Sequence, residues 1–355
     1  MLFFFISLAS CVTLIYLLRG LAYRYGIVDH PGGRKQHEQP TPTVGGLAMF
    51  IAVLVALAAN HSLRGNVEVL LGCAAALLIL GVLDDKHGLS VSLRMLIQVF
   101  LVTVVIMGAG GAVTHLGAVF GLDVQLGMFA VPFSVIAYVG GINAINMIDG
   151  ADGMAGKMAL ITLLGVVSIF YIAKAPELPI AMAMLGSLLG FLLFNSRIFV
   201  KRAWVFMGDA GSMWLGLVLG WFMAQITRGS ISAEPALVLW LFGVPLIDTL
   251  AVMIRRIKHK RSPFHPDRTH IHHVFENKGL STHLSVLTLS MIHFVLVGTG
   301  VMFYVTHAPS YMVFWSFVLL LSVYCYGMRN YGYSLRQMLI QNSAPQMNSD
   351  SSDET

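Results

Sequence analysis

Six acidic and amide side chains stand at or just beyond the ends of long apolar runs, where their types and spacing suit phosphate chemistry. Carboxylates are costly at membrane depth and persist there mostly for function. Oxygen ligands beside a phosphate are the surroundings that Mg²⁺ prefers. We therefore expect a divalent-cation site that faces a phosphate, built from Asp84, Asp85, Asn146, Asp149, Asp152 and Asp209.

The stretch 143–156 is the densest part of this set. Asn146, Asp149 and Asp152 are spaced by three residues, so neighbours share a face if the backbone is helical. Glycines in the same stretch predict that the helix ends there and that the backbone approaches another group closely. An Asx- and glycine-rich turn would explain the glycines, but it would not explain so many Asn and Asp residues.

The other acidic residues have simpler structural explanations beside the chemical one. Asp84 and Asp85 could be a solvated pair at a helix end, but adjacent carboxylates repel, which favours binding a proton or a cation. In Phe206–Ser212, Asp209 could cap the following helix, and the same helix start would attract phosphate. Asp248, inside a later apolar run, either supports the site from behind or pairs two helices.

Histidines and basic residues mark two further loops. The loop 262–273 ends in three histidines within four residues, which could bind zinc, but no cysteine is near and few acids flank them. Together with Arg268 they suit a set of hydrogen-bond donors around a diphosphate better. The first loop, with His37 followed by Pro40–Gly46, is either a basic entry with a tight backbone approach or an ordinary positively charged loop.

The composition places the chain among polytopic membrane proteins. Hydrophobic residues make up 57% of its 355 residues and charged residues 11%, whereas a soluble domain carries about 25% charge. The predicted fold class is therefore an all-α polytopic membrane protein. We expect a single domain over 1–340 and a polar, disordered tail over 341–355. The three cysteines lie far apart in apolar runs, which argues against a disulfide framework.

The apolar runs predict eleven transmembrane helices, and the run that holds Gly243-Val-Pro245 is expected to be kinked. Of the 22 lysines and arginines, all but Arg64, Lys174 and Arg228 fall on one side. The positive-inside rule makes that side cytoplasmic, with the N-terminus outside, the C-terminus inside and the active-site cleft on the cytoplasmic side. The net charge of +5 is then mostly topological, and no nucleic acid is expected. The runs are about 1–18, 44–60, 68–83, 94–110, 128–147, 158–173, 179–194, 212–227, 235–254, 284–306 and 311–328.

Taken together, these motifs match a known family. Over about residues 20–330 the chain resembles the polyprenyl-phosphate N-acetylhexosamine-1-phosphate transferases. Pro263–His273 favours the branch that makes undecaprenyl-diphospho-N-acetylglucosamine, because the muramoyl-pentapeptide branch has a contiguous histidine triplet. One departure is Gly88, which stands where the family often has a third acid in its first acidic motif. The resemblance rests on Pro40–Gly46, Asp84-Asp85, Asn143–Gly156, Phe194-Asn195, Phe206–Gly211 and His270–His273.

The resemblance implies a role for each matching residue. Asp209 would be the principal Mg²⁺ ligand, with Asn146 as its partner. Asp84 and Asp85 would lie beside the polyprenyl phosphate, with one of them accepting its proton, and Arg94 would contact the diphosphate.

The remaining matching residues would surround the nucleotide sugar. Asp152 and Asn195 would read uracil, and Phe206 would stack on it. Asp149 would lie in the catalytic cleft, and His37 and Asn143 are further candidates for substrate binding. The residues that would close over the sugar and the diphosphate are Arg268, His270, His272 and His273.

The implied reaction transfers N-acetylglucosamine 1-phosphate from UDP-N-acetylglucosamine to undecaprenyl phosphate. It gives UMP and the first lipid-linked intermediate of a surface polysaccharide such as O-antigen. The implied location is the bacterial cytoplasmic (inner) membrane. The implied cofactor is Mg²⁺, or alternatively Mn²⁺, and the resemblance is compatible with a homodimer. Another UDP-N-acetylhexosamine remains an alternative. A cation transporter with an acidic site is a remote alternative, since it would need acids near the midplane of the bilayer or on both sides of it.

Overall fold

Helices make up nearly all the regular structure of the computed structural model, which describes residues 1–29, 39–63, 65–149, 153–228, 231, 233–260 and 270–342. The only strands in this part of the chain, β1 (Val28–Asp29) and β2 (Thr41–Pro42), form a short antiparallel pair with Val28 opposite Pro42. The helices are α1 (Leu2–Tyr25), α2 (Gly45–Ala58), α3 (Asn66–His87), α4 (Val91–Gly108), the 3-10 turn η1 (Gly127–Phe129), α5 (Ala130–Ile148), α6 (Met154–Ile172), α7 (Leu178–Asn195), α8 (Gly208–Ile226), α9 (Leu237–Leu241), α10 (Gly243–Lys258), α11 (Ile271–Asn277), α12 (Thr282–Val305) and α13 (Ser310–Asn342).

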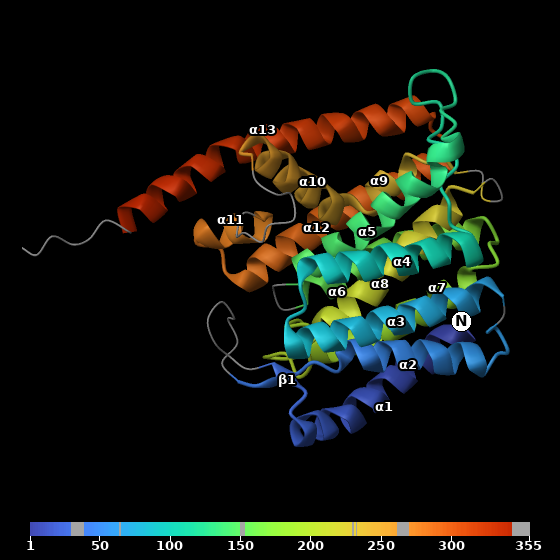
Figure 1. The fold of residues 1–355 in the computed structure, drawn as a ribbon, viewed down its shortest axis with the longest axis vertical. Helices are drawn as coiled ribbons and strands as arrows, with labels where there is room; N and C mark the ends of the chain where they lie inside the picture. The colour runs from blue at the N-terminus through green and yellow to red at the C-terminus, as the bar shows by residue number, and fades with distance from the viewer. Residues whose placement is uncertain are drawn as a thin grey trace, which may run out of the picture.

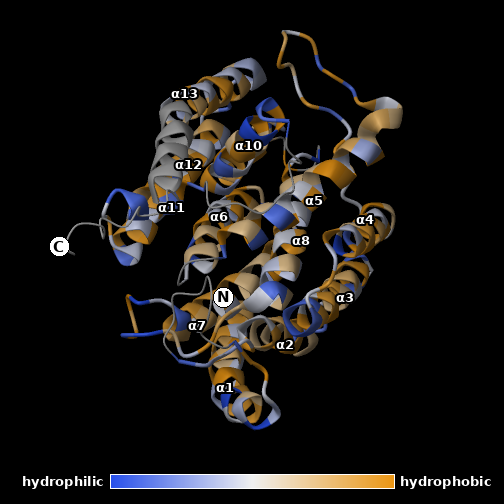
Figure 2. Ribbon diagram, turned by 60° about the vertical axis from the view of Figure 1, so that its left-hand side comes forward, coloured by the Kyte–Doolittle hydropathy of each residue, from blue (hydrophilic) through white to orange (hydrophobic). Residues whose placement is uncertain are grey.

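The helices have the apolar character of membrane spans. Hydrophobic residues cover most of the helical ribbons, and hydrophilic residues gather mainly at helix ends and in loops (Figure 2). Within the described residues, eight helices are long and apolar enough to cross a membrane. The chain is therefore a multi-pass membrane protein. The eight are α1, α3, α4, α5 with η1, α6, α7, α12 and the Ser310–Met328 part of α13.

Each of the eleven predicted apolar runs contains helix, but three of them differ from a simple span. α2 has only 14 residues, α8 begins with a polar turn, and the run 235–254 is divided between α9 and α10. α13 continues beyond its apolar part to Asn342. The count of eleven spans and the orientation of the chain stay predictions.

The middle of the bundle is occupied by α8, which packs against α2, α3, α5 and α6 (Figure 1). Trp214 and Trp221 of this helix are among the largest fully buried side chains in the described structure. Their indole nitrogens donate to the carbonyl oxygens of Gly46 (3.2 Å) and Gly110 (2.9 Å). Because protein surrounds α8, its polar first turn is held inside one end of the bundle.

Two glycine contacts bring neighbouring helices unusually close to the start of α8. A Cβ atom on Gly46 of α2 would lie 2.3 Å from the Cα of Gly211. A Cβ atom on Gly81 of α3 would lie 2.3 Å from the Cα of Ala210. Small residues allow such backbone approach between membrane helices. The glycines of α2 and α3 therefore fix where the first turn of α8 sits.

The kink expected at Gly243-Val-Pro245 is confirmed as a break between α9 and α10. A helix broken among apolar side chains leaves backbone groups that need partners. The amide of Val244 donates to Nδ1 of His293 (3.3 Å), and the hydroxyl of Thr162 donates to the last carbonyl of α9 (3.0 Å). These polar side chains stabilise the break and so set the direction of α10.

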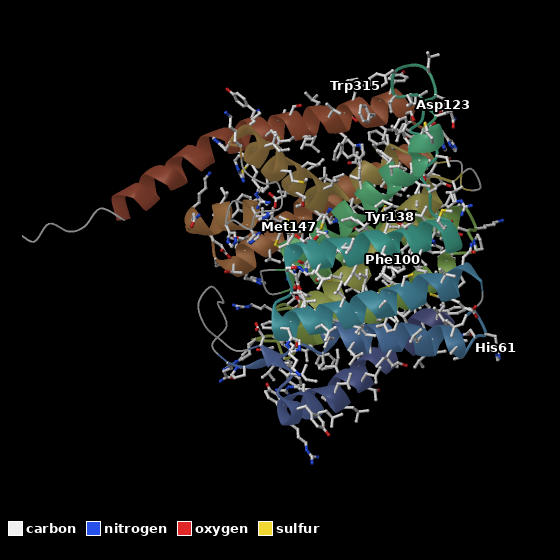
Figure 3. The ribbon with its side chains drawn as sticks, in the orientation of Figure 1. His61, Phe100, Asp123, Tyr138, Met147 and Trp315 are labelled. Carbon is white, nitrogen blue, oxygen red and sulfur yellow. The ribbon has the colours of Figure 1, made fainter. Side chains whose placement is uncertain are left out.

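The two ends of the bundle differ in what they carry. His61 and Asp123, which belong to loops, lie at the opposite end from Met147, near the end of α5 (Figure 3). Met147 follows Asn146 directly in the chain. The acidic motifs therefore belong to the end of the bundle that Met147 marks.

The glycine contact on α3 makes a testable prediction. Gly81→Ala places a methyl group against the backbone of α8, which should cost about 1–3 kcal/mol of stability, as overpacking does. Gly72→Ala on the same helix meets no atom within 4 Å and should leave stability unchanged or slightly raised, because alanine favours helix. Thermal unfolding of the purified variants in detergent would measure this. Equal unfolding midpoints for the two variants would show that the close approach is not needed.

Candidate functional site

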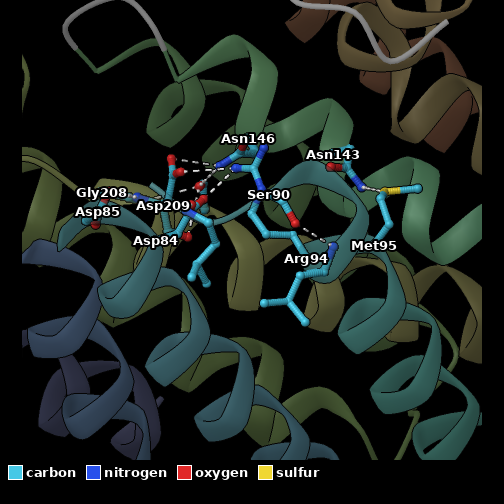
Figure 4. Close-up of polar contacts among 12 residues, drawn as sticks. Asp84, Asp85, Ser90, Arg94, Met95, Asn143, Asn146, Gly208 and Asp209 are labelled. Atoms are coloured by element: carbon cyan, nitrogen blue, oxygen red, sulfur yellow. Dashed lines mark hydrogen bonds and ion pairs between the residues drawn. The ribbon is translucent and has the colours of Figure 1, made fainter. Parts of the chain in front are cut away.

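Three helices bring the predicted acidic residues together at one end of the bundle. Asp84 and Asp85 lie in the last turn of α3, Asp209 lies in the first turn of α8, and Asn146 lies near the end of α5 (Figure 4). The side-chain amide of Asn146 donates to Oδ1 of Asp209 (3.0 Å) and to the hydroxyl of Ser212 (2.9 Å). Motifs that are far apart in the sequence thus form one cluster.

Arg94 of α4 links two of the carboxylates. Its Nη1 donates to Oδ2 of Asp84 at 2.5 Å and lies 3.6 Å from Oδ2 of Asp209. The other oxygen of Asp84 accepts from the amide of Leu89 (2.7 Å). Asp84 is only 7% exposed, and both of its oxygens have partners. This carboxylate is thereby fixed in place and holds Arg94 over the cluster.

Asp85 has different surroundings from its neighbour. It is exposed, and its Oδ1 accepts from the amide of Asp209 (3.2 Å) at the start of α8. Gly208, the residue before Asp209, has a backbone φ of +70°. A Cβ atom at this position would lie 2.7 Å from Oδ2 of Asp85. A side chain at position 208 would therefore disturb both the backbone and this carboxylate. The glycine allows Asp85 to meet the positive end of the α8 dipole.

Asp149, the residue that follows α5, belongs to the same electrostatic environment. Removal from water raises the pKa of its carboxyl group well above the usual range, and the negative charges of Asp209 and Asp85 raise it further. Four carboxyl groups thus influence one another here, and Arg94 offsets part of their charge through its contacts with Asp84 and Asp209. The cluster carries an excess of negative charge.

The donors of this cluster fit a hard divalent cation. Carboxylate and amide oxygens are the ligands that Mg²⁺ takes in proteins, usually one or two carboxylates with the rest from substrate phosphates and water. Asp209 and Asn146 are in contact and could supply the protein ligands. Among the described residues, no group of three or more His, Cys, Asp or Glu side chains is arranged to hold a metal ion. An ion here would therefore depend on amide and substrate oxygens as well.

Asn143 lies one turn before Asn146 and has a partner that sequence reasoning missed. Its side-chain amide donates to Oε1 of Gln98 (2.8 Å) and to the carbonyl of Val139 (2.8 Å). Gln98 is 1% exposed in the otherwise apolar middle of α4. A lone glutamine in a membrane-type helix was the available signal, since such a residue needs an internal partner. This pair fixes α4 and α5 just behind Arg94.

The loop before α8 is held by hydrogen bonds to the segment Pro40–Gly46, which leads into α2. The amide of Phe206 donates to the carbonyl of Pro42 (2.8 Å), and the amide of Gly45 donates back to the carbonyl of Phe206 (3.0 Å). The tight backbone approach predicted for Pro40–Gly46 is thus confirmed. Asn195, at the end of α7, donates to the carbonyl of Val205 (2.9 Å) in the same loop. The structure therefore brings Asn195 and Phe206 to one loop beside Asp209.

The histidine motif begins α11 and is tied to α10. His270 caps the helix, and its Nδ1 lies 2.7 Å from Oδ2 of Asp248. His272 is 3% exposed, and burial, with the charges of His273 and His270 as lesser causes, lowers its pKa to about 3. Its ring is therefore neutral at pH 7. His273 lies further round the helix, with Nδ1 3.4 Å from Oε2 of Glu276.

Three of the predicted site residues lie outside the described residues. These are His37, Asp152 and Arg268.

Comparison with known proteins gives a consistent result. A family model described as glycosyl transferase family 4 matches residues 67–227. Curated proteins named undecaprenyl-phosphate alpha-N-acetylglucosaminyl 1-phosphate transferase match most of the chain. The relative from Salmonella typhi is 31% identical over 88% of this chain and 86% of its own length. Those from Escherichia coli O157:H7 and Haemophilus influenzae are each 30% identical, over 90% and 92% of this chain and 89% and 93% of their own lengths. The chain belongs to the family of these 1-phosphate transferases.

Proposed function

We propose that the protein transfers N-acetylglucosamine 1-phosphate from UDP-N-acetylglucosamine to undecaprenyl phosphate, with UMP as the second product. The relatives that match nearly the whole chain carry this activity in their names. The acidic cluster at the junction of α3, α5 and α8 is the observation that carries the proposal, because phosphoryl transfer needs positioning and electrostatic stabilisation above all. A different UDP-N-acetylhexosamine would fit the same chemistry and stays the alternative.

Asp209 and Asn146 are proposed to hold Mg²⁺, which would supply neutralisation of the diphosphate charge; Mn²⁺ would serve as a substitute. Arg94 adds a fixed positive charge, because Asp84 holds its guanidinium in one orientation. Of the adjacent pair, Asp85 is the better candidate to accept a proton from the lipid phosphate. It is exposed, whereas both oxygens of Asp84 are already bonded.

The nucleotide is proposed to bind beside the start of α8. Phe206 lies in the loop that precedes this helix, and Asn195, at the end of α7, donates to Val205 of the same loop. Gly153, just after the undescribed Asp152, is close to Asn195. A Cβ atom on Gly153 would lie 3.0 Å from Oδ1 of Asn195. We infer that Asp152, Asn195 and Phe206 form the uracil site. The histidine motif with Arg268 would close over the sugar and the diphosphate.

The membrane arrangement is proposed to place both substrates where they are available. By the positive-inside rule, the basic residues that flank the acidic motifs support a position of this end of the bundle on the cytoplasmic side of the inner membrane. UDP-N-acetylglucosamine would then enter from the cytoplasm and undecaprenyl phosphate from the bilayer. The eleven-span topology and a cleft at the cytoplasmic face belong to this proposal.

A transfer assay tests the proposed function. Purified enzyme with radiolabelled UDP-N-acetylglucosamine, undecaprenyl phosphate and Mg²⁺ should move label into the lipid phase. Asp209→Asn should reduce this transfer at least a hundredfold, since loss of a single electrostatic contact in a transition state costs about 10²–10³ in rate. The matched control is Asp123→Asn, which changes a loop carboxylate at the opposite end of the bundle and should keep normal activity. Label transfer by Asp209→Asn near the normal rate at low Mg²⁺ would contradict the assigned ligand.

A further prediction concerns the chemical path of the transfer. We expect the lipid phosphate oxygen to attack the sugar-linked phosphorus directly, so that its new P–O bond replaces the bond to UMP. The lipid phosphate is already an oxyanion at neutral pH, so a covalent relay through an aspartate is not required. Enzyme stripped of lipid should not exchange labelled UMP into UDP-N-acetylglucosamine. Sustained exchange, or a sugar phosphate trapped on an aspartate, would establish the covalent path instead.

A further inference from the structure

Asp248 is the most deeply buried acid among the described residues, and every one of its bonds leads to the histidine motif or to α13. It is 1% exposed on α10. Its Oδ2 pairs with Nδ1 of His270 at 2.7 Å. Its Oδ1 accepts from the amide of Ile271 (3.1 Å) and from the hydroxyl of Tyr324 (2.7 Å). One carboxylate thus joins α10, α11 and α13.

This bonding pattern defines the hydrogen positions. A carboxylate only accepts hydrogen bonds, so the proton between Asp248 and His270 is carried by Nδ1 of the ring. Nε2 is then the remaining polar atom of His270, and no hydrogen-bond partner for it lies among the described residues. The donors from Ile271 and Tyr324 on one oxygen and the ring of His270 on the other hold the carboxylate group in one plane. The ring of His270 is therefore fixed in both orientation and tautomer.

The other two histidines have different surroundings. His272 is buried and neutral, and its Nδ1 has no hydrogen-bond partner. His273 contacts Glu276, which lies on the same short helix. Asp248 connects His270 across helices, and α10, which carries Asp248, also packs against α5, the helix that carries Asn146.

We propose that Asp248, held by Tyr324, is a positioning residue that fixes His270 so that its Nε2 faces the reacting diphosphate. The inference rests on the proposed transferase function and specifies how the histidine motif takes part in it. The same arrangement predicts that the effects of Asp248 and Tyr324 on catalysis pass through His270.

Substitutions at His270 separate anchoring from catalysis. In His270→Asn the side-chain amide nitrogen replaces Nδ1, so the bond to Asp248 can persist while Nε2 is lost. Asp248→Asn does the reverse. Its oxygen must stay at the position that accepts from Ile271 and Tyr324, so its NH₂ group faces Nδ1 of His270. That contact forces the proton of the ring onto Nε2 and reverses the tautomer.

The experiment is a double-mutant cycle on the purified full-length enzyme in the lipid transfer assay. Asp248→Asn should lower kcat at least about tenfold and Tyr324→Phe about three- to tenfold, the effect of one hydrogen bond. KM for UDP-N-acetylglucosamine should change less than twofold in both. In the His270→Asn background neither substitution should lower kcat further, because coupled residues are not additive. Tyr326→Phe on the same helix is the matched control, since Tyr326 is 78% exposed and should tolerate the change.

The outcomes separate three explanations. Additive losses in the His270→Asn background, or losses that follow only the folded fraction measured by thermal unfolding, would reduce Asp248 to a structural residue and overturn the inference. If Asp248→Asn fails to fold, the cycle of Tyr324→Phe with His270→Asn decides by the same criteria. If the unmodified enzyme transfers no label to lipid, the proposed function fails first and this inference falls with it. Normal kcat in Asp248→Asn and Tyr324→Phe, with active unmodified enzyme, would overturn the inference alone.

Discussion

The burial of the first turn of α8 inside the bundle is the constraint on which the site depends. Gly46 and Gly81 let α2 and α3 approach this turn at backbone distance. Asp84, Asp85 and Asp209 are thereby forced together in surroundings where like charges repel strongly. Arg94 offsets part of this charge, and the excess negative charge makes the cluster suitable for a divalent cation. The close packing that Gly46 and Gly81 allow is therefore also the cause of the high negative charge density in the cluster.

Polar contacts outside the cluster hold the helices and the loop that carry its side chains. Gln98 fixes Asn143, the pair Pro42 and Gly45 holds the loop with Phe206, and Asp85 caps the start of α8. Such contacts keep charged groups in place before substrate arrives, which is how preorganised sites favour a transition state. The break at Val244 extends this principle to α10, where His293 satisfies a backbone group that the kink leaves without a helical partner.

Much of this arrangement could be predicted from the sequence, because membrane helices are strongly marked by composition. Helix is present in every predicted apolar run, and the kink near Pro245 and the close approach after Pro40 are confirmed. The pairing of Arg94 with Asp84 could not be predicted, since it depends on the turn at Gly88 that redirects α4. The hydrogen-bond partners of Asp248 could not be predicted from the sequence either. Tyr324 is 76 positions away in the chain, and no periodic pattern connects the two.

The proposed mechanism depends on a divalent cation bound by the cluster around Asp209. Mn²⁺ is paramagnetic and can replace Mg²⁺ at oxygen sites, so electron paramagnetic resonance can measure its binding to the purified protein with UDP-N-acetylglucosamine present. We expect saturable Mn²⁺ binding that Asp209→Asn weakens at least about tenfold, the loss expected from about 1.4 kcal/mol of binding energy. The same Mn²⁺ affinity in Asp209→Asn as in the unmodified protein would show that Asp209 is not a ligand of the cation.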